Sequence, residues 1–123
     1  MPCSKRAVVK ARQKVENFAS LHGFGNSAQD VALATEEALK NVIQHACPAD
    51  NNMHIDGEAT PDSLIIEVAD KGMGFDISEL DADSHTPMEP HGRGIRLMKG
   101  LMDDVRITSD REGTVIRMEK KRR

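Results

Sequence analysis

The 123-residue sequence contains no tryptophan or tyrosine and only three phenylalanines, so its hydrophobic core must be largely aliphatic. Its two cysteines, Cys3 and Cys47, are too few for a disulfide framework and lack the spacing of a Cys/His metal site. No apolar run is long enough to span a bilayer, and the N-terminus lacks the apolar stretch of a signal peptide. These absences predict a cytoplasmic protein with no membrane segment.

A strong excess of one charge is also lacking. The 17 basic and 20 acidic residues leave a formal net charge of −3, which is not the basic balance of a nucleic-acid-binding domain. The basic run at residues 120–123 is expected to be a solvated tail. Since this length lies near the commonest domain size, we expect residues 1–123 to form a single domain.

Hydrophobic periodicity predicts three helices and four strands. Apolar residues three and four positions apart indicate helices, and short apolar runs bounded by turn residues indicate strands. The predicted helices span residues 4–21, 27–47 and 92–102, and the predicted strands span residues 53–59, 63–69, 105–109 and 114–119. Because the helices are segregated from two hairpins, this order predicts an α/β (α+β) fold. It would be a two-layer sandwich whose mixed or mostly antiparallel sheet carries three helices on one face.

The second predicted helix carries a polar stripe beside its apolar residues. Glu37, Asn41 and His45 follow one another at four-residue intervals, so they share one helix face. At about 100° per residue, they line one edge of the apolar arc and are expected to border the core without entering it. Glu36 points away from this stripe and is expected to be solvated. Taken alone, the stripe is adequately explained as a polar rim of the helix.

Two glycine motifs flank a long irregular segment. Asp70-Lys71-Gly72-Met73-Gly74 follows a predicted strand, and Gly92-Arg93-Gly94 precedes a predicted helix. Either motif alone is compatible with a turn. Together they are more specific, because a carboxylate at a strand end can hold the edge of a ligand and a helix N-terminus suits phosphates. An Asn oxygen can bind Mg²⁺, and no GxxxxGK[ST] sequence is present. The combination predicts a nucleotide site without a P-loop.

These segments, in this order, resemble the anti-sigma factor serine kinases. That family belongs to the GHKL group, whose Bergerat-type ATP-binding fold is shared by DNA gyrase, histidine kinases and the MutL mismatch-repair proteins. The resemblance extends over nearly the whole chain and is carried by residues 37–45, 70–75, 92–98, 101–105 and 113–114. It implies one histidine kinase-like ATPase domain over residues 1–123, with an ATP lid at about residues 76–94.

The resemblance also implies a role for each site residue. Glu37 takes the place of the general base, Asn41 is the Mg²⁺ ligand, and Asp70 bonds the adenine amino group. His45 is the last residue of the motif at residues 37–45 and is implied to contact the nucleotide. Its presence is explained equally well by the favourable position of a histidine at a helix C-terminus, near the helix dipole. The other positions implied to contact ATP or ADP are Gly72, Gly74, Phe75, Gly92, Arg93, Gly94, Ile95 and Thr114.

By resemblance, the protein is an ATP-dependent protein serine kinase that acts as an anti-sigma factor. It would phosphorylate a serine of a STAS-type anti-anti-sigma partner, hold a sigma factor inactive and form a homodimer. Two alternatives remain: a nucleotide-gated binding regulator without significant kinase activity, and a detached ATP-binding domain of a larger signalling protein. Glu37 favours catalysis, because a serine hydroxyl needs a base that the phosphoacceptor imidazole of a histidine kinase does not.

The chain departs from the family pattern at its start. These kinases usually carry a β-strand before the first helix, whereas only three residues precede the predicted helix here. The edge of the sheet is therefore expected to be truncated or finished in another way. This departure bears on dimerisation and partner docking more than on nucleotide binding.

Overall fold

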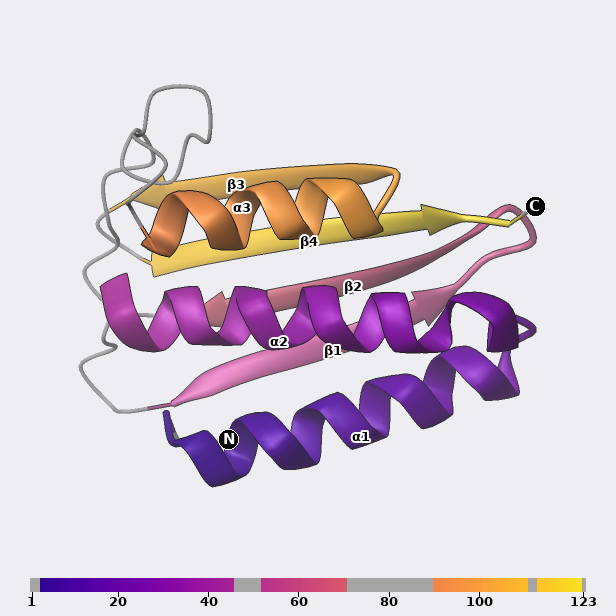
Figure 1. The fold of residues 1–123 in the computed structure, drawn as a ribbon, viewed down its shortest axis with the longest axis horizontal. Coiled ribbons are helices and arrows are strands. Elements are labelled where there is room, and N and C mark those ends of the chain that lie inside the picture. Colours follow the sequence, from indigo (N-terminus) through magenta and orange to yellow (C-terminus); the bar gives the residue numbers. More distant parts are fainter. Residues whose placement is uncertain (1–2, 46–51, 71–89, 111–112, 123) are drawn as a thin grey trace.

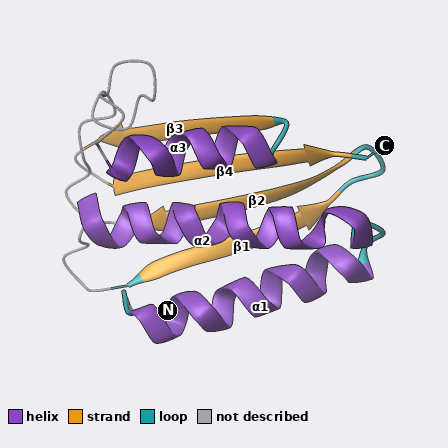
Figure 2. Cartoon of the chain, viewed as in Figure 1, coloured by secondary structure: helices purple, strands orange, loops and turns teal. Residues whose placement is uncertain are grey.

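The computed structural model describes residues 3–45, 52–70, 90–110 and 113–122. The helices are α1 (Lys5–Leu21), the short 3-10 helix η1 (Gly25–Ser27), α2 (Ala28–His45) and α3 (Pro90–Leu101), and the strands are β1 (Met53–Ala59), β2 (Ser63–Asp70), β3 (Asp104–Asp110) and β4 (Gly113–Lys121). Every predicted helix and strand is confirmed, with boundaries that move by one or two residues (Figure 1, Figure 2). Of the helices described, none is both long enough and apolar enough to cross a membrane.

Helix α1 begins at a capped end and buries one stripe. Ser4 is extended (φ −137°, ψ 156°), and its Oγ accepts a hydrogen bond from the backbone N–H of Ala7 at 3.2 Å. This bond satisfies one of the N–H groups that the first turn of a helix leaves without a partner. Gly23 adopts a φ of 87° shortly after the helix ends, a conformation that favours glycine. The buried stripe consists of Ala7, Val8, Ala11, Val15 and Ala19.

The four strands form one sheet in the order β1-β2-β4-β3. Each of the three strand pairs is antiparallel, so the described part of the sheet is antiparallel rather than mixed. Figure 1 shows the three α-helices on the same face of the sheet, as predicted. On the opposite face, Glu67 and Arg117 are cross-strand partners whose side chains approach to 3.5 Å. The molecule is therefore a two-layer sandwich with one polar sheet face.

The core lies between the helices and the sheet, and it is aliphatic, as the composition predicts. Helix α2 packs between α1 and α3 and contacts β2, so it carries much of the buried surface. The largest fully buried side chains are Leu39, Met53, Leu64, Ile66, Ile95, Met98, Ile116, Met118, Val31, Val42 and Val68. Three of them, Val31, Leu39 and Val42, belong to the predicted apolar arc of α2, which is thereby confirmed.

The basic C-terminal run is not a free tail, because β4 extends to Lys121 and Arg122 is hydrogen-bonded to other segments, although Lys121 and Arg122 are exposed to solvent as predicted. Strand β4 includes Lys120, whose ammonium donates to the backbone carbonyl of Leu101 at 2.7 Å. The next residue but one, Arg122, donates to the carbonyls of three residues in two other segments. A run of basic residues usually indicates a solvated terminus. Here the run continues β4, and its side chains donate hydrogen bonds to backbone carbonyls from elsewhere in the chain.

Candidate functional site

Among the described residues, five polar side chains are buried in the otherwise aliphatic core: Thr35, Asn41, Ser63, Asp70 and Thr114. Two have local explanations. The Thr35 hydroxyl donates to a backbone carbonyl one turn earlier in α2 at 2.8 Å, and the Ser63 hydroxyl is hydrogen-bonded to the Thr60 hydroxyl at 3.2 Å in the β1–β2 turn. The other three lie at the end of the sandwich where α2 and β2 finish and β4 begins, on the left in Figure 1. We call this the polar end, defined by Asn41, Asp70 and Thr114.

Asp70 ends a row of apolar side chains on β2. Side chains alternate across a strand, and Leu64, Ile66, Val68 and Asp70 are all buried on the helix-covered face, with exposed fractions of 0 to 4%. The antiparallel register sets Asp70 opposite Thr114, which is completely buried. A carboxylate thus takes the last position of an apolar row. Because burying a carboxylate is costly unless polar groups match it, packing alone does not explain the choice of residue.

Asn41 is at the polar end in the helical layer. Its exposed fraction is 3%, so the prediction that it borders the core without entering it is wrong. The side-chain Nδ2 makes no hydrogen bond to any described residue. A buried polar group without a partner costs about 1–3 kcal/mol, and such exceptions in native proteins call for a specific explanation. A bound ligand at this end would supply one.

Glu37 lies one helical turn before Asn41 and is more accessible, with 20% of its side chain exposed. Its Oε1 lies 3.7 Å from the ammonium of Lys40, a residue of the same motif to which the resemblance assigns no role but whose i, i+3 spacing from an opposite charge indicates the contact. The adjacent Glu36 turns toward α1, where Arg12 donates to its Oε2 at 2.9 Å. With 17% of its side chain exposed, Glu36 is half-buried and ion-paired, so the prediction that it is solvated is wrong.

The start of α3 also lies at the polar end in Figure 1. The helix begins at Pro90, two residues before the predicted start, so Gly92, Arg93 and Gly94 fall within its first turns. This placement brings the second glycine motif to the same end as Asp70 and Asn41. Ile95 follows directly, and its side chain is 1% exposed and packed in the core.

The remaining predicted contacts cannot be placed. Gly72, Gly74 and Phe75 lie outside the described residues, as does most of the expected lid at residues 76–94. His45 is the last residue of α2, and the structure describes its backbone but not its side chain. The roles of these residues stay predictions.

The chain matches the family model described as the histidine kinase-like ATPase domain over residues 1–120. It belongs to this family. A relative from Bacillus licheniformis named serine-protein kinase RsbW is 33% identical, and the match covers 97% of this chain and 81% of the relative. A protein of the same name from Bacillus mycoides is 33% identical, with 98% of this chain and 81% of the relative covered. The predicted family and the predicted enzyme class, a serine kinase, are confirmed.

A solved structure shares the fold of this histidine kinase-like ATPase domain. The histidine kinase domain of the blue-light activated histidine kinase from Erythrobacter litoralis EL346 aligns with a TM-score of 0.58 at 20% identity. The alignment covers 76% of this chain and 47% of the other, so the match spans about half the length of that kinase. At this identity the likeness concerns the fold alone, and it confirms the predicted ATP-binding architecture.

The polar end of this ATPase domain fits a magnesium nucleotide. Mg²⁺ keeps several waters and is usually bound through one or two protein oxygens together with substrate phosphates. The described residues contain no group of three or more His, Cys, Asp or Glu that could hold a metal ion, and the Asn41 amide offers the single oxygen that such a site requires. Asp70 and Thr114, side by side on neighbouring strands, offer a buried acceptor and a hydroxyl to a base. The described residues thus offer one amide oxygen, one carboxylate and one hydroxyl at this end.

Proposed function

We propose that this protein is an ATP-dependent serine kinase that acts as an anti-sigma factor. In this proposal it transfers the γ-phosphate of ATP to a serine of a STAS-type anti-anti-sigma partner and sequesters a sigma factor, as a cytoplasmic homodimer. The observation that carries the proposal is the position of the buried Asn41 amide one turn after the accessible Glu37 carboxylate. Membership of the ATPase family and the serine-protein kinase relatives support it.

Asn41, Asp70 and Thr114 would hold the nucleotide. Mg·ATP supplies the transferable phosphoryl group and a metal charge that offsets the negative charge of the transition state. The Asn41 oxygen would bind the Mg²⁺, the Asp70 carboxylate would accept a hydrogen bond from the adenine amino group, and the Thr114 hydroxyl would support the same edge of the base. A buried acceptor is selective because a base that offers no donor at this position would forgo the hydrogen bond.

Glu37 would act as the general base. A serine hydroxyl is a weak nucleophile, and a carboxylate within hydrogen-bond reach can accept its proton as the phosphoryl group is transferred. The 20% exposure of the Glu37 side chain leaves it accessible to a hydroxyl on a partner protein, whereas Asn41 is enclosed. The difference in exposure matches the difference in role, because one residue must meet the partner and the other must hold the metal.

Replacing Glu37 tests the assignment. The Glu37→Gln variant keeps the size and polarity of the side chain but cannot accept the proton. Single-turnover transfer from labelled ATP to the purified STAS-type partner should therefore fall by about 10²–10⁴-fold. Affinity for Mg·ATP, measured by calorimetry, and binding to the sigma factor should be unchanged, because neither requires proton transfer.

Glu36→Gln is the matched control. Glu36 is the neighbouring residue and has similar side-chain exposure, but its carboxylate is engaged by Arg12. This variant should transfer phosphate at the wild-type rate and lose at most a small amount of stability, because pairs of this kind contribute about 0–1 kcal/mol. A wild-type transfer rate in Glu37→Gln would show that the stripe is only a helix rim and that the assigned mechanism is wrong.

A further inference from the structure

The helical layer extends past one edge of the sheet. Figure 1 shows α1 alongside β1, on the side away from β2. Three helices, each about 10 Å in diameter, cover about 30 Å, whereas four strands spaced at about 4.8 Å cover about 19 Å. The sheet layer below α1 is therefore narrower than the helical layer, by the width of about two strands.

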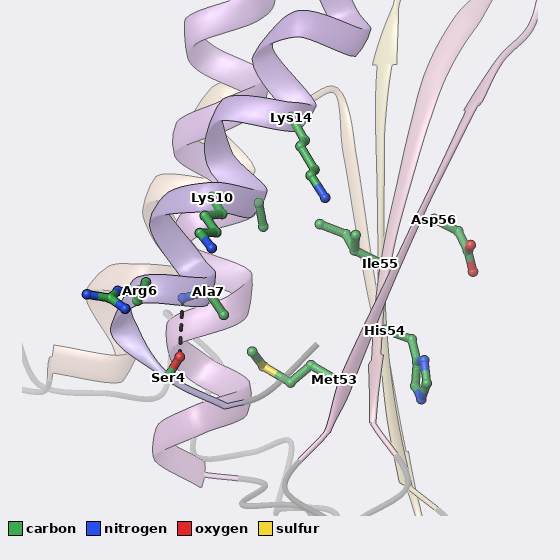
Figure 3. A pocket seen from close by; sticks show the side chains of 10 residues that line it. Ser4, Arg6, Ala7, Lys10, Lys14, Met53, His54, Ile55 and Asp56 are labelled. Atoms are coloured by element: carbon green, nitrogen blue, oxygen red, sulfur yellow. Dashed lines mark hydrogen bonds between the residues drawn. The ribbon is translucent and has the colours of Figure 1, made fainter.

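A groove of about 540 Å³ lies between the N-terminal half of α1 and β1 (Figure 3). Its lining includes Lys10 and Lys14 from α1 and Met53 and Ile55 from β1. A second cavity of about 250 Å³ continues along β1 as far as Gly57, and Lys14 and Ile55 line both. The two cavities together follow the first five residues of the seven-residue strand.

The helix wall of the groove is basic. Arg6, Lys10 and Lys14 line it at four-residue intervals, so they form one row on α1. In the described parts of the chain, no ion pair or hydrogen bond is found for any of the three, whereas Arg12 of the same helix is paired. The acidic residue that lines the groove, Asp56, points to the opposite face of the sheet in Figure 3. In a chain with a net charge of −3, this row is a local excess of positive charge.

β1 is an edge strand, because the sheet ends there within the residues that the structure describes. In an antiparallel pair, alternate residues direct their backbone N–H and C=O groups away from the neighbouring strand. Proteins often protect such an edge with charged side chains, especially lysine, or with proline. The β1 sequence MHIDGEA contains no lysine or proline, and its two charged residues, Asp56 and Glu58, alternate with Ile55 and so lie on the sheet face opposite the groove. The backbone of β1 is therefore suited to pair with a further strand.

We propose that an extended acidic segment of a partner protein binds as a fifth strand on β1, below the basic row of α1. Backbone hydrogen bonds to the edge would supply affinity, and side chains would supply specificity. Four helix residues rise about 6.0 Å and two strand residues about 6.6 Å, so acidic residues at every second position match cations at every fourth. The ligand class is an extended peptide with Asp or Glu at alternate positions. A second copy of this chain is a poorer occupant, because it would bring two basic rows to one interface.

The test uses a fluorescein-labelled eight-residue peptide of alternating Glu and Thr, titrated with the full chain without nucleotide and followed by fluorescence anisotropy. Binding should be saturable and weaken with salt. The double variant Lys10→Glu/Lys14→Glu should weaken it by about tenfold or more, because two attractions become repulsions. The matched control, Lys99→Glu/Lys121→Glu, changes the net charge equally outside the groove, and it should change the affinity by less than about twofold.

A second peptide of alternating Glu and Pro separates strand pairing from charge attraction. It keeps the acidic residues but lacks half of the backbone donors and cannot pair as a strand, so it should bind about tenfold or more weakly. Equal binding of the two peptides, equal effects of the two double variants or no saturable binding would each overturn the proposal. Peptide affinity that falls as the concentration of unlabelled chain rises, with a dimer of the chain seen by analytical ultracentrifugation, would place a second copy at the edge and would also overturn it. None of these outcomes bears on Glu37 or on nucleotide binding, so the kinase proposal is tested separately.

Discussion

At the end of the sandwich around the β1–β2 turn, polar groups are hydrogen-bonded to one another within the chain, and we call this the closed end. At the polar end, by contrast, the buried Nδ2 of Asn41 makes no hydrogen bond to the described residues. Arg122 accounts for much of the hydrogen bonding at the closed end. It donates to the carbonyls of Pro61 at 3.1 Å, His22 at 3.1 Å and Thr60 at 3.3 Å. Its guanidinium also lies 4.5 Å from the centroid of the Phe24 ring, within cation–π range. One side chain thus joins the hairpin, the α1–α2 connection and the end of β4.

The polar end also contains polar residues, but there they are buried, and one of them lacks a hydrogen bond within the described part of the chain. Asn41 is buried, and its Nδ2 makes no hydrogen bond to the described residues, while Asp70 and Thr114 occupy core positions that apolar residues fill elsewhere in β2 and β4. The closed end therefore stabilises the unbound protein. In the proposed function, the polar end would lower the stability of the unbound protein in return for groups that a nucleotide can match, a common relation between stability and activity.

Asp70 separates a folding role from a nucleotide-binding role at the polar end. Asp70→Asn keeps the size of the side chain but replaces a charged acceptor with an amide. A hydrogen bond to a charged group is worth about 1.5–3 kcal/mol, so calorimetry should show ATP affinity reduced by about 10–100-fold. The free energy of unfolding of the nucleotide-free variant should stay near or above that of the wild type, because a buried charge is removed. Wild-type affinity would refute the adenine assignment.

Arg122→Ala probes the closed end, where the opposite result is expected. Loss of three exposed hydrogen bonds and one cation–π contact should lower the free energy of unfolding by about 1–2 kcal/mol. ATP affinity should not change, because Arg122 lies at the other end of the sheet. Arg122→Lys is the control: it keeps the charge but not the planar fork of donors, and it should recover only part of the loss. If Arg122→Ala weakened ATP binding as well, the two ends would be coupled.

The helices and strands follow from local sequence patterns. The spacing of Val8, Ala11 and Val15 predicts α1, and the apolar run before Asp70 predicts β2, because these patterns depend on neighbours in the sequence. The motif around Asp70 and the Glu37–Asn41 spacing single out candidate residues, but it is the resemblance to the kinase family that implies a shared site and includes Thr114 in it. Strand order could not be predicted from such patterns, since the adjacency of β2 and β4 depends on contacts between distant segments.

The burial of Asn41 could not be predicted from the helical spacing of residues on α2 alone. Glu36 and Asn41 are five residues apart, so at about 100° per residue they lie about 140° apart around α2. Glu36 faces α1 through Arg12, and α3 packs against α2 as a second neighbour. The sequence gives the angle between the two residues, but the exposed fraction of each depends on how closely α1 and α3 flank α2. The role of Arg122 is hidden for the same reason, because its partners lie about 60 and 100 residues earlier in the chain.

The smallest effect expected is a change in unfolding free energy on replacing Asn41, and its sign should be opposite to that for Arg122 at the closed end. Asn41→Ala removes the buried amide and substitutes the residue with the highest helix propensity, so the nucleotide-free protein should gain about 0.5–1 kcal/mol of unfolding free energy. The same variant loses the proposed Mg²⁺ ligand, so its ATP affinity should be lower and should depend less on whether Mg²⁺ or a chelator is present. Chemical denaturation and calorimetry measure the two quantities, with Arg122→Ala, which loses stability and keeps affinity, as the reference. If Asn41→Ala lost stability and kept the magnesium dependence of the wild type, Asn41 would be a structural residue and the polar end would not be a nucleotide site.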